Sequence, residues 1–228
     1  MFKSLLSLFC LFLAGCNIVG AGAVVGEKIF GPAAVDAEYK LGTEPVLILV
    51  ENYRNPLGAL SDSEEVSQFV VDALHENLKE TDKDKPAKIN IIDPEKLLEY
   101  QNAHPIEYAK MKIPDIGRAL GAKQVLYVDL MVSGVDATPG SELLRAKFAA
   151  NVKVVDVATG QTRWPNDMAH GTPVAWESKP QRPTDEVYPA AVRERALRVG
   201  SDHIARLFYK WKPDDAPDDD ELQAVPSI

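Results

Sequence analysis

The pattern of apolar residues along the chain first predicts a set of β-strands. Mostly apolar runs at 45–50, 89–92 and 124–132 are bounded by turn residues, as is typical of strands buried on both faces. At 144–154 apolar and polar residues alternate one by one, which predicts a long strand with one buried and one wet face. A Thr-Gly turn then leads into a returning strand at 162–164.

Apolar residues that recur every three to four positions predict helices elsewhere in the chain. These helices are expected at 61–78, 94–100, 113–120 and 184–211. Ser61 and Glu64 match a capping box at the start of the first helix, and His75 falls on its polar face. Asp93 is the expected N-cap of the second. The proline-rich segment 166–183 is irregular and predicts no element.

The order of these elements is β, α, β, α, α, β, β, β, α. Helices separate the first three strands, which predicts parallel strands joined by right-handed crossovers. The last three strands predict an antiparallel meander. The expected fold class is therefore α/β, with a mixed sheet, a parallel β-α-β start, an antiparallel end, packed helices and a long C-terminal helix.

The start of the chain has the pattern of a secretory signal. Lys3 supplies a positive charge, an apolar run follows over 4–13, and small residues at 14–15 precede Cys16. This run is too short to cross a bilayer, which needs roughly 20 apolar residues. Cys10 would leave with the signal, so no thiol would remain for a disulfide or a metal site if Cys16 carries a lipid.

Leu13-Ala14-Gly15-Cys16 resembles the lipobox of bacterial lipoproteins. The resemblance implies lipid on the Cys16 thiol, cleavage before it, and acylation of the new amino terminus with fatty acids such as palmitate. Asn17 follows, and by resemblance to enterobacterial lipoproteins the absence of Asp there implies the outer membrane, facing the periplasm. The alternative is an ordinary cleaved signal with an incidental cysteine.

Charge narrows the expected partners. The formal net charge is −9, which opposes nucleic-acid binding because that depends on Lys and Arg neutralising phosphates. It also gives no polybasic attraction to anionic lipid, so the expected membrane contact is the lipid anchor itself.

These features divide the chain into four expected parts. They are a lipoprotein signal peptide at 1–15, a lipidated flexible tether at 16–43, a single α/β domain at 44–212 and an acidic disordered tail at 213–228. The glycines of 20–26 do not predict a dinucleotide-binding loop, since such a loop follows a strand and opens a helix.

Four features of the domain occur together in a known group of envelope proteins. They are the first strand with its helix at 61–78, a helix-Leu-Gly-Ala-strand passage at 116–126, a strand with an Asp-Val-x-Thr-Gly turn at 152–160, and the closing helix. The chain thus resembles the group of the curli-secretion lipoprotein CsgG, the amino-terminal domain of TolB and the penicillin-binding-protein activator LpoB. The resemblance covers 44–212 and implies the fold, an envelope location and a non-enzymatic partner-binding or assembly role. The chain departs from the group at 166–183 and lacks the long amphipathic hairpins of a CsgG-type pore.

No residue pattern predicts catalysis, a cofactor or a metal. Ser201, Asp202 and His203 are the residue types of a serine triad, but neighbours on a helix diverge by about 100°, whereas a triad needs converging side chains. The histidines show no pair at metal-ligand spacing; they are His75, His104, His170 and His203. Asp129 is interpreted as a carboxylate that lies on the solvent-exposed face of its strand or is hydrogen-bonded.

Trp164 and Trp176 are the candidate partner-binding residues, because they flank the proline-rich segment and loop aromatics often anchor partners. Packing against the sheet is the alternative for both. The leading hypothesis for function is a lipid-anchored protein that binds envelope proteins without catalysis. Two others stay open: a structural component of a secretion or export complex, which predicts an oligomer, and a hydrolase, which predicts a deep pocket with at least two convergent titratable groups.

Overall fold

The computed structural model describes residues 33–52, 59–80, 89–137, 142–184 and 188–213. These residues fall into two compact units. In the first, the backbones of Val35 and Trp211 exchange two hydrogen bonds, at 2.8 and 3.1 Å, and Lys210 pairs with Asp36 at 2.9 Å. The second unit spans 37–209 and contains every helix and strand named below. The signal peptide, the lipidation site, residues 17–32 of the tether and residues 214–228 of the acidic tail lie outside the described residues.

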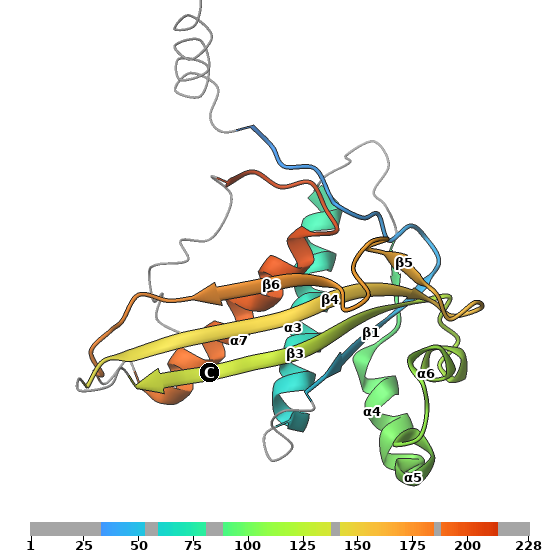
Figure 1. Ribbon diagram of the computed structural model, residues 1–228, viewed down its shortest axis with the longest axis horizontal. Helices are drawn as coiled ribbons and strands as arrows, with labels where there is room; N and C mark the ends of the chain where they lie inside the picture. Colours follow the sequence, from blue (N-terminus) through green and yellow to red (C-terminus); the bar gives the residue numbers. More distant parts are fainter. Residues whose placement is uncertain (1–32, 53–58, 81–88, 138–141, 185–187, 214–228) are drawn as a thin grey trace, which may run out of the picture. The chain divides into compact units, whose positions relative to one another are not determined.

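The elements of the second unit follow the order shown in Figure 1. They are β1 Pro45–Glu51, α3 Ala59–Glu80, β2 Asn90–Ile91, α4 Pro94–Ala103, α5 Pro105–Tyr108, α6 Ile113–Ala119, β3 Gln124–Ala137, β4 Leu144–Asp156, β5 Thr162–Trp164, β6 Thr172–Glu177 and α7 Pro189–Arg206.

One mixed sheet organises this unit. Its strands run in the order β2-β1-β3-β4-β5, and β6 also pairs with β4. β1 is parallel to both β2 and β3, whereas β4 is antiparallel to β3, β5 and β6. The predicted α/β class, with a parallel start, an antiparallel end and a C-terminal helix, is confirmed.

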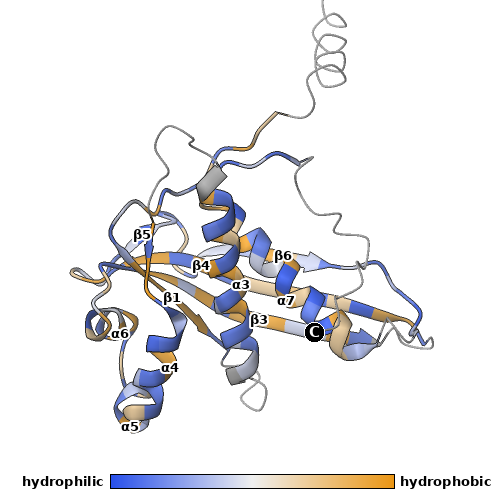
Figure 2. Ribbon diagram, turned by 180° about the vertical axis from the view of Figure 1, so that it is seen from behind, coloured by the Kyte–Doolittle hydropathy of each residue, from blue (hydrophilic) through white to orange (hydrophobic). Residues whose placement is uncertain are grey.

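Helices cover both faces of the sheet. On one face α3 and α7 contact each other and the strands β1, β3 and β4. On the other face α4 and α6 close a core that includes Leu47 and Leu49 of β1, Leu97 of α4 and Ile116 of α6. Figure 2 shows hydrophobic residues along β1 and β3, and hydrophilic residues on the outward turns of α3 and α7.

Segment 166–183 contains a strand that the sequence did not predict. Residues 172–177 form β6, which pairs with β4 so that Val174 lies opposite Ala150 and Trp176 opposite Phe148. Pro173 is compatible with this strand because, among the described strands, β6 pairs with β4 alone, and prolines within sheets are found on such edge strands. The interpretation of the whole segment as irregular was therefore wrong.

Helix ends also differ from expectation. α3 begins at Ala59, so Ser61 lies inside the helix and its hydroxyl donates to the Glu65 carboxylate at 2.9 Å. The capping box was therefore wrong. The N-cap role of Asp93 is confirmed, since its side chain accepts the Glu95 N–H at 3.0 Å.

α7 covers 189–206, which is shorter than the predicted helix at both ends, and Pro189 occupies its first turn as expected. Residues 37–43, which the sequence assigned to the tether, belong to the second unit. The N–H groups of Glu38 and Tyr39 donate to the Leu207 carbonyl, and Leu41 is buried. Among the described residues, no helix has the length and apolar character needed to cross a membrane.

Candidate functional site

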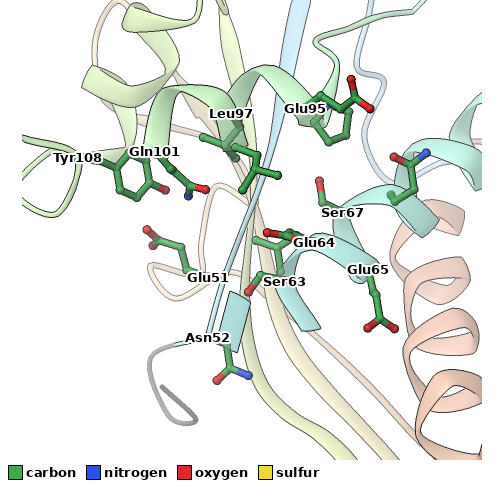
Figure 3. A pocket seen from close by; sticks show the side chains of 14 residues that line it. Glu51, Asn52, Ser63, Glu64, Glu65, Ser67, Glu95, Leu97, Gln101 and Tyr108 are labelled. Carbon is green, nitrogen blue, oxygen red and sulfur yellow. The ribbon is translucent and has the colours of Figure 1, made fainter. Parts of the chain in front are cut away.

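A pocket lies where the end of β1 meets α3 and α4. Its volume of about 450 Å³ is in the range typical of small-molecule sites. The lining comes from 50–52 at the end of β1, from 63–68 of α3, from 94–101 of α4, and from Tyr108 of α5. Figure 3 shows Leu97, Gln101 and Tyr108 on one side of the space between the two helices, with Ser63, Glu64 and Ser67 on the other.

The pocket exists because β1 lacks a full-length neighbour on one side. β2 pairs with β1 only at Pro45 and Val46, and no further described strand lies along this edge of β1. The chain turns into α4 directly after β2, since Asp93 caps that helix. α3 and α4 then cover opposite faces of β1, and the space between them beyond the strand edge stays open.

The inner part of the lining is apolar. Val50 at the end of β1 and Leu97 on α4 are 7% and 8% exposed, and Leu98 and Pro94 lie beside them in the lining. Such a surface favours an apolar portion of a ligand through the hydrophobic effect, at roughly 25 cal/mol per Å² of apolar area that it removes from water.

Glutamates supply the charge of the pocket. Glu51, Glu64, Glu65 and Glu95 all line it, and no lysine, arginine or histidine is among its described lining residues. Glu65 also accepts hydrogen bonds from Ser61 at 2.9 Å and from Arg193 of α7 at 3.2 Å. Glu64 and Glu95 are exposed at the rim. The pocket is therefore locally negative.

Tyr108 adds a polar group at the α4–α5 end. Burial raises the pKa of its phenol, a hydrogen bond with Gln101 acts in the opposite direction, and the nearby negative charge of Glu51 raises it further. The phenol is therefore neutral at neutral pH. Figure 3 shows Glu51 pointing toward Tyr108 and Gln101.

Ser67 is the unsatisfied polar group of the site. It is 5% exposed, and its Oγ has no hydrogen-bond partner although it lines the pocket. Figure 3 shows this oxygen pointing from α3 toward α4. An unsatisfied buried hydroxyl costs about 1–3 kcal/mol, and a ligand that hydrogen-bonds to it would remove this cost.

The two predicted partner-binding tryptophans lie elsewhere. Trp164 on β5 is half-buried, and its ring centroid lies 5.7 Å from that of Phe208 and 6.2 Å from that of Tyr39. Trp176 on β6 packs against the buried cluster that contains Ala146 and Val192. Both residues thus make packing contacts within the domain and neither lines the pocket, while their predicted role in partner binding stays a prediction.

The residues tested for chemistry do not converge. Ser201 is fully buried, and its hydroxyl donates to the Val66 carbonyl of α3 at 3.5 Å. Asp202 pairs with Arg206 one turn along α7 at 2.5 Å. Asp129 is half-buried on β3 opposite Asn151. Among the described residues, no group of three or more His, Cys, Asp and Glu is placed to hold a metal ion.

The sequence indicated no functional role for any residue of the pocket. Ser63 and Ser67 stand four positions apart at the border of the apolar stripe of α3, and this was the one local signal. The burial of Ser67 depends on where α4 packs, which no local pattern encodes.

No protein-family profile and no curated protein matches the chain. Several solved structures are similar to it at low identity. The lipoprotein GNA1162 from Neisseria meningitidis is 12% identical, over 59% of this chain and 81% of its own, with a TM-score of 0.39. The PelC dodecamer from Paraburkholderia phytofirmans is 11% identical, over 78% and 96%, with a TM-score of 0.38. Protein XCC0632 from Xanthomonas campestris, of the DUF330 family, is 12% identical, over 77% and 88%, with a TM-score of 0.31. Likeness at this level carries no functional argument.

Proposed function

We propose that this chain is a lipid-anchored protein of the bacterial envelope whose domain binds a partner or ligand in the α3–α4 pocket without catalysing a reaction. The observation that carries the binding role is the pocket itself, with its apolar interior, its glutamates and the unpartnered Ser67 hydroxyl. The lipobox ending at Cys16 and the resemblance to the CsgG, TolB and LpoB group support the envelope location. On this proposal the anchor lies in the outer membrane and the domain faces the periplasm.

Binding fits the pocket better than hydrolysis does. The hydrolase hypothesis requires convergent titratable groups, and Glu51 and Tyr108 do approach each other here. A serine nucleophile, however, needs a base within hydrogen-bond reach. The Ser67 hydroxyl has no hydrogen-bond partner, and the described lining contains no histidine, lysine or cysteine. The geometry therefore offers a recognition surface without an activated nucleophile.

The anchor is tested by expressing the full chain in a bacterium that processes lipoproteins. We expect the wild type in the membrane fraction, with an amino-terminal peptide that begins at residue 16 and carries the mass of acyl chains. Cys16→Ser should abolish that mass and leave the precursor uncleaved at this site. Cys10→Ser is the matched control, because it removes the other cysteine of the chain and should leave lipidation unchanged. An unmodified Cys16 in the mature protein would remove the envelope part of the proposal.

Use of the pocket is tested with a photo-crosslinking amino acid at Gln68, which lines it, and at His75, an exposed residue of the same helix outside it. In living cells we expect a crosslinked adduct from position 68 and none from position 75. Ser63→Trp, which fills the pocket from α3, should abolish the adduct. Equal crosslinking from both positions, or none from either, would contradict a binding role for this pocket.

A further inference from the structure

We propose that the α3–α4 pocket recognises a cationic group, an ammonium or guanidinium, carried on a short apolar stem. This inference rests on the proposed binding function and names the chemical class of the ligand. The free small-molecule amine and the Lys or Arg side chain of a polypeptide share this chemistry.

The charged side chains around the pocket share one sign and come from several elements. Glu51 lies at the end of β1, Glu64 on α3 and Glu95 on α4, so carboxylates approach the pocket from three different elements. The described lining contains no lysine, arginine or histidine, and Glu65 pairs with Arg193 of α7. Like charges around a partly enclosed space repel an anionic ligand and attract a cation. The spread over three elements suits a group with several N–H donors pointing in different directions.

Ser67 adds a hydrogen-bonding group that is not a glutamate. The Ser67 hydroxyl is buried, lacks a partner and points into the space between α3 and α4. A hydroxyl oxygen accepts hydrogen bonds through two lone pairs, and an ammonium or guanidinium supplies three to five donors. By itself the hydroxyl could bind either a hydrogen-bond donor or an acceptor of a ligand. The carboxylates around it favour a ligand that donates.

The interior of the pocket suits an uncharged, apolar portion of the ligand. Val50, Pro94, Leu97 and Leu98 form an apolar interior in a volume of about 450 Å³. That space exceeds what a bare ammonium ion fills and matches an alkyl chain or a single ring attached to the charged group. A charged head with an apolar stem satisfies both parts of the lining at once.

The test compares three probes of the same shape, 4-phenylbutylamine, 4-phenylbutanol and 4-phenylbutyrate, titrated calorimetrically into the full-length chain in detergent micelles. Heats from empty micelles are subtracted. We expect binding of the amine, and binding at least about tenfold weaker for the neutral and the anionic probe. Equal affinity for the three probes, or no binding of the amine, would overturn the proposal.

Matched variants locate the interaction. Glu64→Gln with Glu95→Gln removes two rim carboxylates, one from α3 and one from α4. Glu76→Gln with Glu99→Gln removes two exposed carboxylates from the same two helices outside the lining. We expect the rim pair to weaken amine binding about tenfold and the outside pair to change it less than about twofold. Equal weakening by both pairs would reduce the effect to overall charge and overturn the proposal.

Ser67→Ala should weaken amine binding by about threefold, through loss of one hydrogen bond. The tripeptides acetyl-Gly-Lys-Gly-amide and acetyl-Gly-Arg-Gly-amide distinguish the sources. If they bind as tightly as the amine, the natural source is a polypeptide side chain, and if only the amine binds, it is a small molecule. Failure of every cationic probe while the Gln68 adduct persists would overturn the cation proposal and leave the binding function standing.

Discussion

Gly200 of α7 lies directly over the ring of Phe148 on β4. A Cβ atom at position 200 would stand 2.2 Å from Cγ of that ring, and Phe148 is buried, at 1% exposed. The close approach of α7 to the sheet therefore depends on the missing side chain, and it places α7 beside α3, whose other border lines the pocket.

Gly200→Ala should destabilise the domain. In an exposed helix interior this change stabilises by about 1 kcal/mol, but overpacking of a filled core costs about 1–3 kcal/mol, and here the second effect should dominate. Chemical denaturation measures the free energy of unfolding. The double variant with Phe148→Leu should lose less than the sum of the two single variants, because the smaller residue relieves the contact. Strict additivity would mean that the two residues do not press on each other.

Asp62 and Arg193 join α3 to α7. Asp62 is buried and accepts hydrogen bonds from Arg193 and from Ser133 of β3. Burial works against the charge of the guanidinium, but hydrogen bonds to Asp62 and Glu65 outweigh it and raise the pKa of Arg193. Asp62→Ala should cost roughly 2–3 kcal/mol, somewhat less than for a fully buried pair because Arg193 is partly exposed.

Glu65→Ala is the matched control for this pair. Glu65 is more exposed than Asp62 and lies farther from Arg193, at 3.2 Å, so its loss should cost under about 1 kcal/mol. Thermal and denaturant unfolding of the two variants side by side decide the matter. If both variants lost the same free energy of unfolding, the stabilisation would come from the overall negative charge of α3 and not from the Asp62–Arg193 pair.

Elements defined by local chemistry were the ones that the sequence predicted. Asp93-Pro94 carries its own start signal for α4, and Gly121, at φ +76°, ends the turn after α6 as a glycine there should. β1 was predicted because both of its faces are buried, which leaves an uninterrupted apolar run.

The remaining features depend on contacts between distant segments. β6 contains a proline and buries only Val174, so its extended form comes from pairing with β4 rather than from its own composition. Ser67 looks in the sequence like any polar residue at a helix border. Only the position of α4, which begins after a different strand, makes its hydroxyl buried and unpartnered.

Asp156 should make the stability of the domain depend on pH in the acid range. Its carboxylate accepts the Thr159 N–H at 2.8 Å and pairs with Arg163 at 2.6 Å, and these contacts lower its pKa from 3.8 to about 2. A carboxyl whose pKa falls on folding stabilises the folded state above its unfolded pKa. This contribution is lost as the pH falls from about 4 to about 2.

Asp156→Asn should therefore lower the melting temperature most at neutral pH. The gap between variant and wild type should narrow between pH 4 and pH 2, as the wild-type carboxylate takes up a proton. Melting curves recorded by circular dichroism across this range measure the gap. A gap of constant size down to pH 2 would show that Asp156 acts through its shape and not through its charge.

Ser67→Ala should stabilise the ligand-free domain while it weakens ligand binding. The change removes a buried hydroxyl that has no partner, and alanine is also the better helix former, so a gain of about 1 kcal/mol is expected. Ser201→Ala is the control, since that buried hydroxyl does have a partner in the Val66 carbonyl and its removal should bring no such gain. When a residue serves function at the expense of stability, its replacement raises the free energy of unfolding and weakens binding. Replacement of a purely structural serine does not have both effects. Denaturant unfolding without ligand measures the change in stability, and the amine titration measures the change in binding. A loss of stability in Ser67→Ala would mean that the hydroxyl already has a partner in the folded protein.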